Sequence, residues 1–447
     1  MHKAISYIIQ RAMAYTQLIN RKVLYNFFIS SFGSLLLKGL SLFSAPITLR
    51  YISPSEYGLL SLANSFTNIT AIFLGFGLRQ AFSLEFFHLS ANEQKYMIND
   101  ILFVYCVANS LVYFFFILFS PIINHFAFAG AASNSLLYIT FFISFFYFFT
   151  GLFYQLLQYF QEVKKLMLLQ ISIACFVFGL QLIFLCIGNL GIISILLAQA
   201  IGLCISGIFA LYWYTKKIGF SYIHLEKKIQ KIYFYIFSGI PFIPTVLFGW
   251  ILSCGDRWVL AHYTNLSNVG LYAVADSFSQ LFNLAVLYPL SCAYLPHLQK
   301  LYKKENNTIL SIEKWNKKIM WLSMIFFFFI VTIGYFICKP ILYYILPPNY
   351  HATIHHIWGI LCGSIFYLGT YFTQALIQYH KKKWFLACAI AIPALLNIGL
   401  NFLLVKEYAI GGCVCATVIS YATYFIITFW YNQKLCTKLQ TIHLKKS

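Results

Sequence analysis

Residues 55–69, SEYGLLSLANSFTNI, have a counterpart 212 positions later in residues 267–281, SNVGLYAVADSFSQL. The two segments align without gaps, and six of the fifteen positions are identical. A second pair, YQLLQY at 154–159 and QALIQY at 374–379, repeats at an offset of 220. All four segments lie in or beside strongly apolar runs. The pattern therefore indicates two copies of one helical unit.

The composition is that of a membrane protein. Of the 447 residues, 61% are hydrophobic and only 9% are charged, against about 25% charged in a soluble domain. Apolar runs of about 18 residues or more are typical of membrane-spanning helices. The sequence predicts an all-α polytopic membrane protein with twelve such spans, at 27–49, 57–79, 98–120, 134–157, 166–187, 190–213, 235–262, 268–295, 319–338, 355–378, 384–405 and 409–430.

The basic residues give the orientation. With the N-terminus in the cytoplasm, 26 of the 31 Lys and Arg fall on the cytoplasmic side, three on the outer side and two inside spans. This asymmetry follows the positive-inside rule and predicts that both termini are cytoplasmic. The net charge of +20 then faces anionic lipid, so it does not indicate nucleic acid as a partner.

Both repeats pair a span with the sixth span after it, which predicts two bundles in the same orientation. The predicted units are an N-terminal interfacial helix (1–23), a first six-helix bundle (24–213), a cytoplasmic linker (214–234), a second six-helix bundle (235–430) and a basic tail (431–447).

Several charged residues lie inside or at the ends of predicted spans, where they usually face a bundle interior or a watery cavity. Lys38 is near the middle of the first span, either as a cavity cation that attracts an anion or as the partner of a carboxylate such as Asp276. Arg257 suits phosphate oxygens or an internal ion pair. Its neighbour Asp256 faces another direction on a helix, so we expect separate partners. Arg79 either meets a headgroup at the cytoplasmic mouth or anchors the topology.

Asp276 occupies the position that Asn64 holds in the first repeat. A buried carboxylate can titrate near neutral pH, which suits coupling to protons. Asp276, with Asp256 beside Arg257, is therefore a candidate for ion coupling. The alternative is that Asp276 is a fixed partner of Lys38 or Arg257.

Prolines in two of the predicted spans are candidate hinges. Pro46 lies in the outer half of the first span, and Gly239, Pro241 and Pro244 lie in the inner part of the seventh. Proline removes a backbone donor and kinks a helix. These positions are either hinges or static kinks.

The sequence has no recognisable catalytic or metal-binding pattern. The twelve cysteines are scattered, and there is no phosphate-cradling glycine loop, His-Glu-x-x-His or nucleophile elbow. We therefore expect a transporter without cofactor or metal, and not an enzyme. The rival is an integral-membrane polysaccharide polymerase or glycosyltransferase, which would need a larger outer segment than 121–133 or 339–354.

Short motifs open each half of the chain. The first half has Lys38-Gly39, Ala45-Pro46, Arg50-Tyr51-Ile52-Ser53-Pro54 and Glu56-Tyr57-Gly58. The second has Gly239-Ile240-Pro241, Pro244, Gly249-Trp250, Asp256-Arg257 and Val269-Gly270-Leu271-Tyr272. Together they resemble bacterial polysaccharide flippases of the O-antigen type, in the multidrug/oligosaccharidyl-lipid/polysaccharide exporter superfamily.

The resemblance implies a V-shaped pair of six-helix bundles around a central cationic cavity, with Lys38 and Arg257 as cavity cations. With Arg79, placed by its position at the inner end of the second span, they are the expected substrate-binding residues. The resemblance also implies a flippase that carries a polyprenyl-pyrophosphate-linked oligosaccharide from the inner to the outer leaflet of the bacterial inner membrane, for lipopolysaccharide or other surface polysaccharide. The implied partners are that glycolipid, membrane lipids, a polysaccharide polymerase and glycosyltransferases. A multidrug exporter of the same superfamily is the alternative.

Overall fold

The computed structural model describes residues 21–75, 78–79, 82, 86, 89–160, 162–217, 219, 237, 239–240, 243–304 and 309–444. Within these residues every regular element is a helix. One long helix falls at each of the twelve predicted spans: α2 (Arg21–Tyr51), α3 (Pro54–Leu74), α5 (Ala91–Leu118), α7 (Asn134–Tyr159), α8 (Val163–Cys186), α9 (Ile192–Lys217), α11 (Ile243–Tyr263), α12 (Leu266–Phe282), α14 (Ile309–Ile345), α15 (His351–Tyr379), α16 (Lys383–Tyr408) and α17 (Ile410–Leu444).

Shorter elements connect or continue these helices. They are α6 (Ser120–Phe128), two π-helical segments η3 (Asn283–Leu287) and η4 (Leu290–Tyr294), α13 (Leu295–Lys304) and the 3₁₀ turn η6 (Pro348–Tyr350). Some long helices exceed their predicted spans: α14 begins ten residues before residue 319, and α17 continues through most of the predicted tail to Leu444.

Nine of the described helices are long and apolar enough to cross a membrane. The three long helices outside that set are α2, α11 and α12. Helix α11 carries Asp256 and Arg257, and α12 has only 17 residues before its π-helical continuation and carries Asp276. Charges lower the mean hydropathy of a span without preventing its insertion when they face protein.

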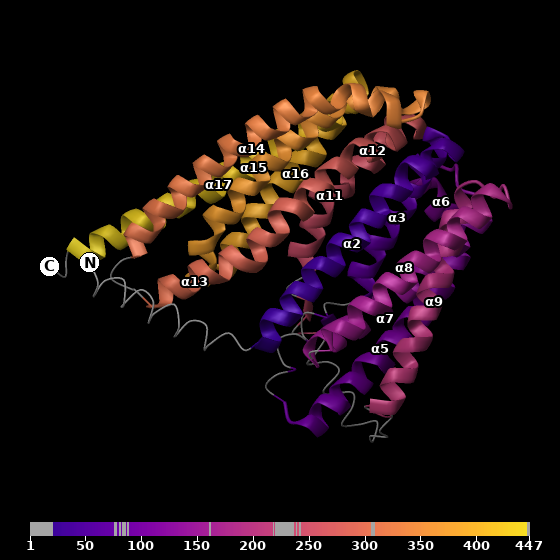
Figure 1. The fold of residues 1–447 in the computed structure, drawn as a ribbon, viewed down its shortest axis with the longest axis horizontal. Helices are drawn as coiled ribbons and strands as arrows, with labels where there is room; N and C mark the ends of the chain where they lie inside the picture. Colours follow the sequence, from indigo (N-terminus) through magenta and orange to yellow (C-terminus); the bar gives the residue numbers. More distant parts are fainter. Residues whose placement is uncertain are drawn as a thin grey trace.

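The helices form two groups that meet at one end and separate at the other (Figure 1). Helices α2 to α9, in indigo to magenta, make one arm of a V. Helices α11 to α17, in red to yellow, make the other. The arms meet where α3 and α12 begin, and the described C-terminal end of α17 lies at the open end. The V shape that the family resemblance implied is therefore present.

The two repeat segments begin with matched caps. Ser53 precedes α3, where its hydroxyl accepts from Glu56 N (3.3 Å) and the Glu56 carboxylate accepts from Ser53 N (2.9 Å), forming a capping box. Asn265, 212 positions later, precedes α12 and its side chain accepts from Asn268 N at 2.9 Å. Local capping thus starts both helices at the equivalent residue.

Helices α3 and α12 touch backbone to backbone at the closed end. A Cβ added to Gly58 would lie 2.1 Å from Leu266 O, and one added to Gly270 would lie 1.9 Å from Pro54 O. Gly58 and Gly270 are equivalent in the repeat, and each faces the first turn of the other helix. The contact is therefore two-fold symmetric and admits only glycine without a shift of the helices.

Candidate functional site: an ion pair between the bundles and a cavity toward the open end

Arg257 and Asp276 form a buried ion pair. Arg257 Nη2 lies 2.6 Å from Asp276 Oδ2, with side-chain exposures of 8% and 16%. Arg257 Nη1 donates to Ser65 Oγ at 3.3 Å, and Trp250 Nε1 donates to the Ser65 carbonyl at 3.2 Å. Gln280 Nε2 donates to the same carboxylate oxygen at 3.0 Å. Because Ser65 is on α3, this cluster joins the second bundle to the first.

Asp256 has different partners. Its carboxylate accepts a hydrogen bond from the Tyr272 hydroxyl and another from the Arg257 backbone N–H at 2.9 Å. The Tyr272 hydroxyl also lies 3.4 Å from Thr417 Oγ1 of α17. The prediction that Asp256 and Arg257 have separate side-chain partners is confirmed. Asp276 occupies the place expected of a fixed partner of Arg257.

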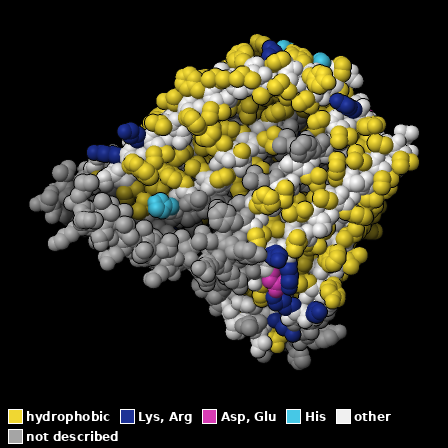
Figure 2. All heavy atoms as spheres, viewed as in Figure 1, with side chains coloured by type: hydrophobic (Ala, Val, Ile, Leu, Met, Phe, Trp, Pro, Cys, Tyr) yellow, Lys and Arg dark blue, Asp and Glu magenta, His cyan; other side chains and the backbone are white. Residues whose placement is uncertain are grey.

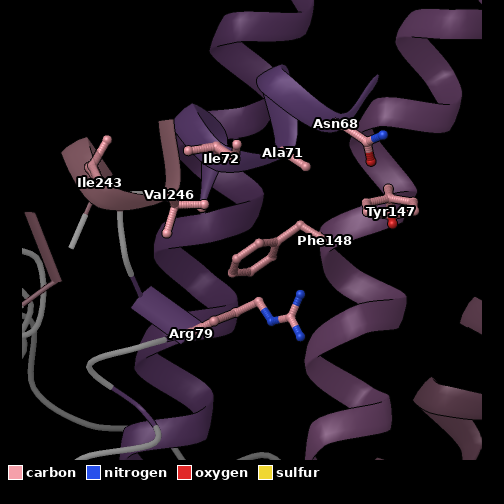
Figure 3. A pocket seen from close by; sticks show the side chains of 9 residues that line it. Asn68, Ala71, Ile72, Arg79, Tyr147, Phe148, Ile243 and Val246 are labelled. Atoms are coloured by element: carbon pink, nitrogen blue, oxygen red, sulfur yellow. The ribbon is translucent and has the colours of Figure 1, made fainter. Parts of the chain in front are cut away.

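A cavity of about 220 Å³ lies between the bundles toward the open end. Helices α3 and α7 of the first bundle and α11 of the second form its wall (Figure 3). The lining residues are Asn68, Ala71, Ile72, Gly75, Arg79, Tyr147, Phe148, Ile243 and Val246. Among the described residues of this lining, Arg79 is the one charged side chain, and it gives the cavity a positive charge.

The Arg79 side chain is positioned against α7. Its Nε donates to Gln155 Oε1 at 3.5 Å, and Gln155 Nε2 lies 3.4 Å from the Arg79 carbonyl and 2.7 Å from the Tyr159 hydroxyl. A Cβ at Gly151 would come within 3.1 Å of Arg79 Nη1, so glycine there leaves room for the guanidinium. Figure 3 shows the guanidinium between the helices, below the Phe148 ring.

The structure separates the predicted cations. Arg257 meets α3 at Ser65, whereas the cavity begins at Asn68, one turn nearer the open end. Arg79 lies at the far end of that lining. Lys38 belongs to α2, but the structure describes only its backbone and not its side chain.

The predicted hinge residues lie in three places. Pro46 is half-buried inside α2, which continues past it. Pro244 is exposed in the first turn of α11, and Gly239 is buried just before that helix, while Pro241 lies outside the described residues. The described part of α11 thus begins after the Gly239 to Pro241 segment.

Several cavity residues were not predicted. Tyr147 and Phe148 belong to a run of aromatic residues in an apolar helix, and Asn68 is one of two asparagines in α3. The repeat gave no signal for Gln155, the partner of Arg79, because its counterpart at the offset of 220 is Ala375.

Solved structures with the same fold are membrane transporters. An inward-facing multidrug resistance MATE family transporter of the MOP superfamily aligns with a TM-score of 0.69 at 13% identity, over 90% of this chain and 95% of that one. The lipid II flippase MurJ, in an inward closed conformation, aligns with a TM-score of 0.67 at 15% identity, over 92% and 91%. An outward-facing MATE structure aligns with a TM-score of 0.57 at 12% identity, over 93% and 96%.

These alignments cover nearly the whole chain and confirm the predicted fold of two six-helix bundles in a multi-pass membrane protein. Comparison with curated proteins gives no significant sequence match. The family model described as polysaccharide biosynthesis protein matches residues 23–302. Because this match spans more than half of the chain, the protein belongs to the polysaccharide biosynthesis protein family.

Proposed function

We propose that this protein is a flippase for a polyprenyl-pyrophosphate-linked oligosaccharide used in surface polysaccharide biosynthesis, such as the O-antigen of lipopolysaccharide. The observation that carries the proposal is Arg79, the single charged residue that the structure describes in the lining of the cavity between the bundles. A guanidinium offers a planar fork of donors that matches phosphate oxygens. Polar Asn68 and Tyr147 add further donors on the same wall.

The charge distribution supports loading from the cytoplasmic side of a bacterial inner membrane. The helix ends at the open side of the V carry Lys95, Lys165, Lys217, Lys303 and Lys434. On the positive-inside rule this side is cytoplasmic. A glycolipid in the inner leaflet would then reach Arg79 from the open end, with its isoprenoid tail in the bilayer.

Release on the outer side would require the closed end to open. The Gly58 and Gly270 contact would separate, and the bonds from Arg257 and Trp250 to Ser65 would break. The Arg257–Asp276 pair lies within the second bundle and would move with it. Rocking of one bundle against the other is the motion typical of such repeats. Pro46 and the Gly239 to Pro244 segment are proposed flexible points.

Two further roles belong to this proposal. Lys38, at mid-depth of α2, is proposed as a second cation for the same pyrophosphate, and Arg257 as a ligand that becomes accessible when the closed end opens. The glycosyltransferases that build the glycolipid and a polymerase that consumes it are the proposed functional partners.

The test is transport by Arg79→Gln in proteoliposomes. The probe is a polyprenyl pyrophosphate bearing one fluorescent sugar, and the readout is its protection from an added quencher. We expect the initial rate to fall by about 10- to 100-fold, because a hydrogen-bonded charge contact contributes about 1.5–3 kcal/mol. Arg79→Lys keeps the charge and should lose less.

Arg50→Gln is the matched control, since Arg50 is exposed at the outer end of α2 and lines no part of the cavity. It should transport normally. Unchanged flipping by Arg79→Gln would sink the assignment of Arg79. Export of a cationic dye with no flipping of the glycolipid would support the multidrug alternative. Lengthening of the glycan by purified protein would support a polymerase.

A further inference from the structure

A second hollow lies on the outside of the first bundle, where α7, α8 and α9 end or begin. Two adjoining pockets of about 570 Å³ and 460 Å³ share Lys165, Leu169 and Phe209, so they form one continuous groove. It runs from the start of α8 toward the middle of α8 and α9. None of its lining residues lines the cavity between the bundles.

The end of the groove near the helix termini is basic. Lys165, Lys216 and Lys217 line it together with a single carboxylate, Glu162. Glu162 pairs with Lys217, lies 3.1 Å from Lys165 Nζ and accepts from Trp213 Nε1 at 3.1 Å. Three lysines against one carboxylate leave an excess of positive charge. Figure 2 shows dark blue side chains gathered around an acidic one near the free end of this bundle.

Glu162 remains ionised in this setting. Burial raises the pKa of its carboxyl group, but hydrogen bonds from Lys217, Lys165 and Trp213 and the charge of Lys217 outweigh burial and hold the pKa below its usual value. The carboxylate therefore orders two lysines at the mouth of the groove without cancelling all of their charge.

Aromatic rings lie beside the lysines at this end of the groove. Lys217 Nζ lies 5.2 Å from the Trp213 ring centroid, and Lys216 Nζ lies 5.8 Å from that of Tyr212. Trp and Tyr are enriched at the depth of lipid headgroups, and lysines there extend toward phosphate. The basic end of the groove therefore sits at the membrane interface.

The other end of the groove is apolar. Its walls are Leu168, Leu169, Ile173, Phe176, Ile205 and Phe209. Lys165 and Phe176 are eleven residues apart on α8, about 16 Å of helix, which is about half the hydrocarbon thickness of a bilayer. The groove is therefore about as long as one leaflet is thick. Like a leaflet, it is charged at one end and apolar at the other.

We propose that this groove binds one anionic phospholipid of the surrounding cytoplasmic leaflet. Lys165 and Lys216 hold the phosphate, and an acyl chain lies along Leu169 and Phe209. The site is separate from the cavity at Arg79 and does not depend on which substrate the cavity carries. A lipid bound there would be held against the outside of the first bundle, at α8 and α9.

The test is native mass spectrometry of the full-length protein in detergent, titrated with phosphatidylglycerol or with phosphatidylcholine of the same acyl chains. We expect phosphatidylglycerol to bind about tenfold more tightly, since each basic residue near the surface attracts anionic lipid. Lys165→Gln/Lys216→Gln should remove that preference while leaving the pairing of Glu162 with Lys217. Ser172→Trp, which fills an exposed part of the groove, should weaken the lipid without changing charge.

The matched control is Lys381→Gln/Lys382→Gln, which removes two exposed lysines beside α16 of the other bundle. It should keep the preference. If this control loses the preference for phosphatidylglycerol to the same extent, the lysines attract anionic lipid from the whole surface and not from a site, and the proposal is overturned. Equal binding of soluble glycerol phosphate would exclude a role for the acyl groove. Displacement of phosphatidylglycerol by polyprenyl pyrophosphate, abolished by Lys165→Gln/Lys216→Gln, would make the groove a substrate site and overturn it as well.

Discussion

Helices α3 and α12 descend from one sequence pattern, yet only α12 carries a charge in its interior. Both helices begin with a side-chain cap, and both present a glycine to the other at the closed end. Asn64 of α3 corresponds to Asp276 of α12, and at the same offset Ala45 corresponds to Arg257. The first repeat thus has alanine and amide where the second has the ion pair.

The comparison separates the glycine contact, to which both repeats contribute, from the ion pair, which only the second repeat carries. The glycine contact is made by both copies, because a close crossing requires a small residue on each helix. The charge and its counter-charge occur together in one copy, because either alone would be an unpaired ion at membrane depth. The pair also supplies the bond from Arg257 to Ser65 across the arms.

The largest expected effect is that of Asp276→Asn. It leaves Arg257 buried without its counter-charge, and breaking a buried pair in this way costs about 3–5 kcal/mol of the free energy of unfolding. The double substitution Arg257→Ala/Asp276→Asn copies the first repeat and should recover most of the loss. Thermal unfolding of the detergent-solubilised protein measures both.

If the double variant is as unstable as Asp276→Asn alone, the carboxylate acts through something other than Arg257. The same variants bear on coupling. A protein with Asp276→Asn that keeps its folded yield but loses the dependence of transport on the proton gradient would support a titrating role for Asp276.

A smaller effect is expected from Gly58→Ala and Gly270→Ala. Each added methyl would meet a backbone carbonyl of the partner helix, and such overpacking costs about 1–3 kcal/mol. Because the contact is symmetric, we expect the two variants to widen the closed end alike. Spin labels at Arg50 and His262, which are exposed and equivalent in the repeat, report the spacing.

Gly399→Ala is the control for these glycines, since an added Cβ there meets no atom within 4 Å. It should leave the label distances unchanged. An unchanged spacing in Gly58→Ala would mean that other contacts, such as the Tyr350 hydroxyl on the Ile52 carbonyl at 2.9 Å, hold the closed end.

The smallest effect is expected from Asn64→Asp, which gives α3 the carboxylate of α12 without an arginine. Asn64 is half-buried, and the counterpart of Arg257 in the first repeat is Ala45, which has no charge. The new carboxyl group can take up a proton instead, so the loss should be about 1 kcal/mol. Adding Ala45→Arg should restore stability if the two repeats share one geometry at this point. Thermal unfolding distinguishes the two outcomes.

The sequence predicted the twelve helices and their two-bundle arrangement well, because membrane-spanning segments depend on hydropathy summed over many residues. It left the partner of Arg257 open, because which helix face meets which depends on rotations that hydropathy does not specify. Tyr147 and Phe148 were missed for a related reason, since an aromatic ring facing a cavity and one facing lipid have the same composition. The extensions of α14 and α17 were missed because helices can continue beyond the apolar core.

The π-helical segments after α12 rotate the rest of that helix relative to its counterpart in the first repeat. A π turn takes one more residue than an α turn, so each one rotates the side chains that follow by about 100°. Segments η3 and η4 lie in this continuation, whereas α3 is α-helical from Pro54 to Leu74. Beyond residue 282 the two copies therefore no longer present equivalent faces. The described walls of the cavity between the bundles differ in charge: the first copy contributes Arg79, and the second contributes the apolar Ile243 and Val246.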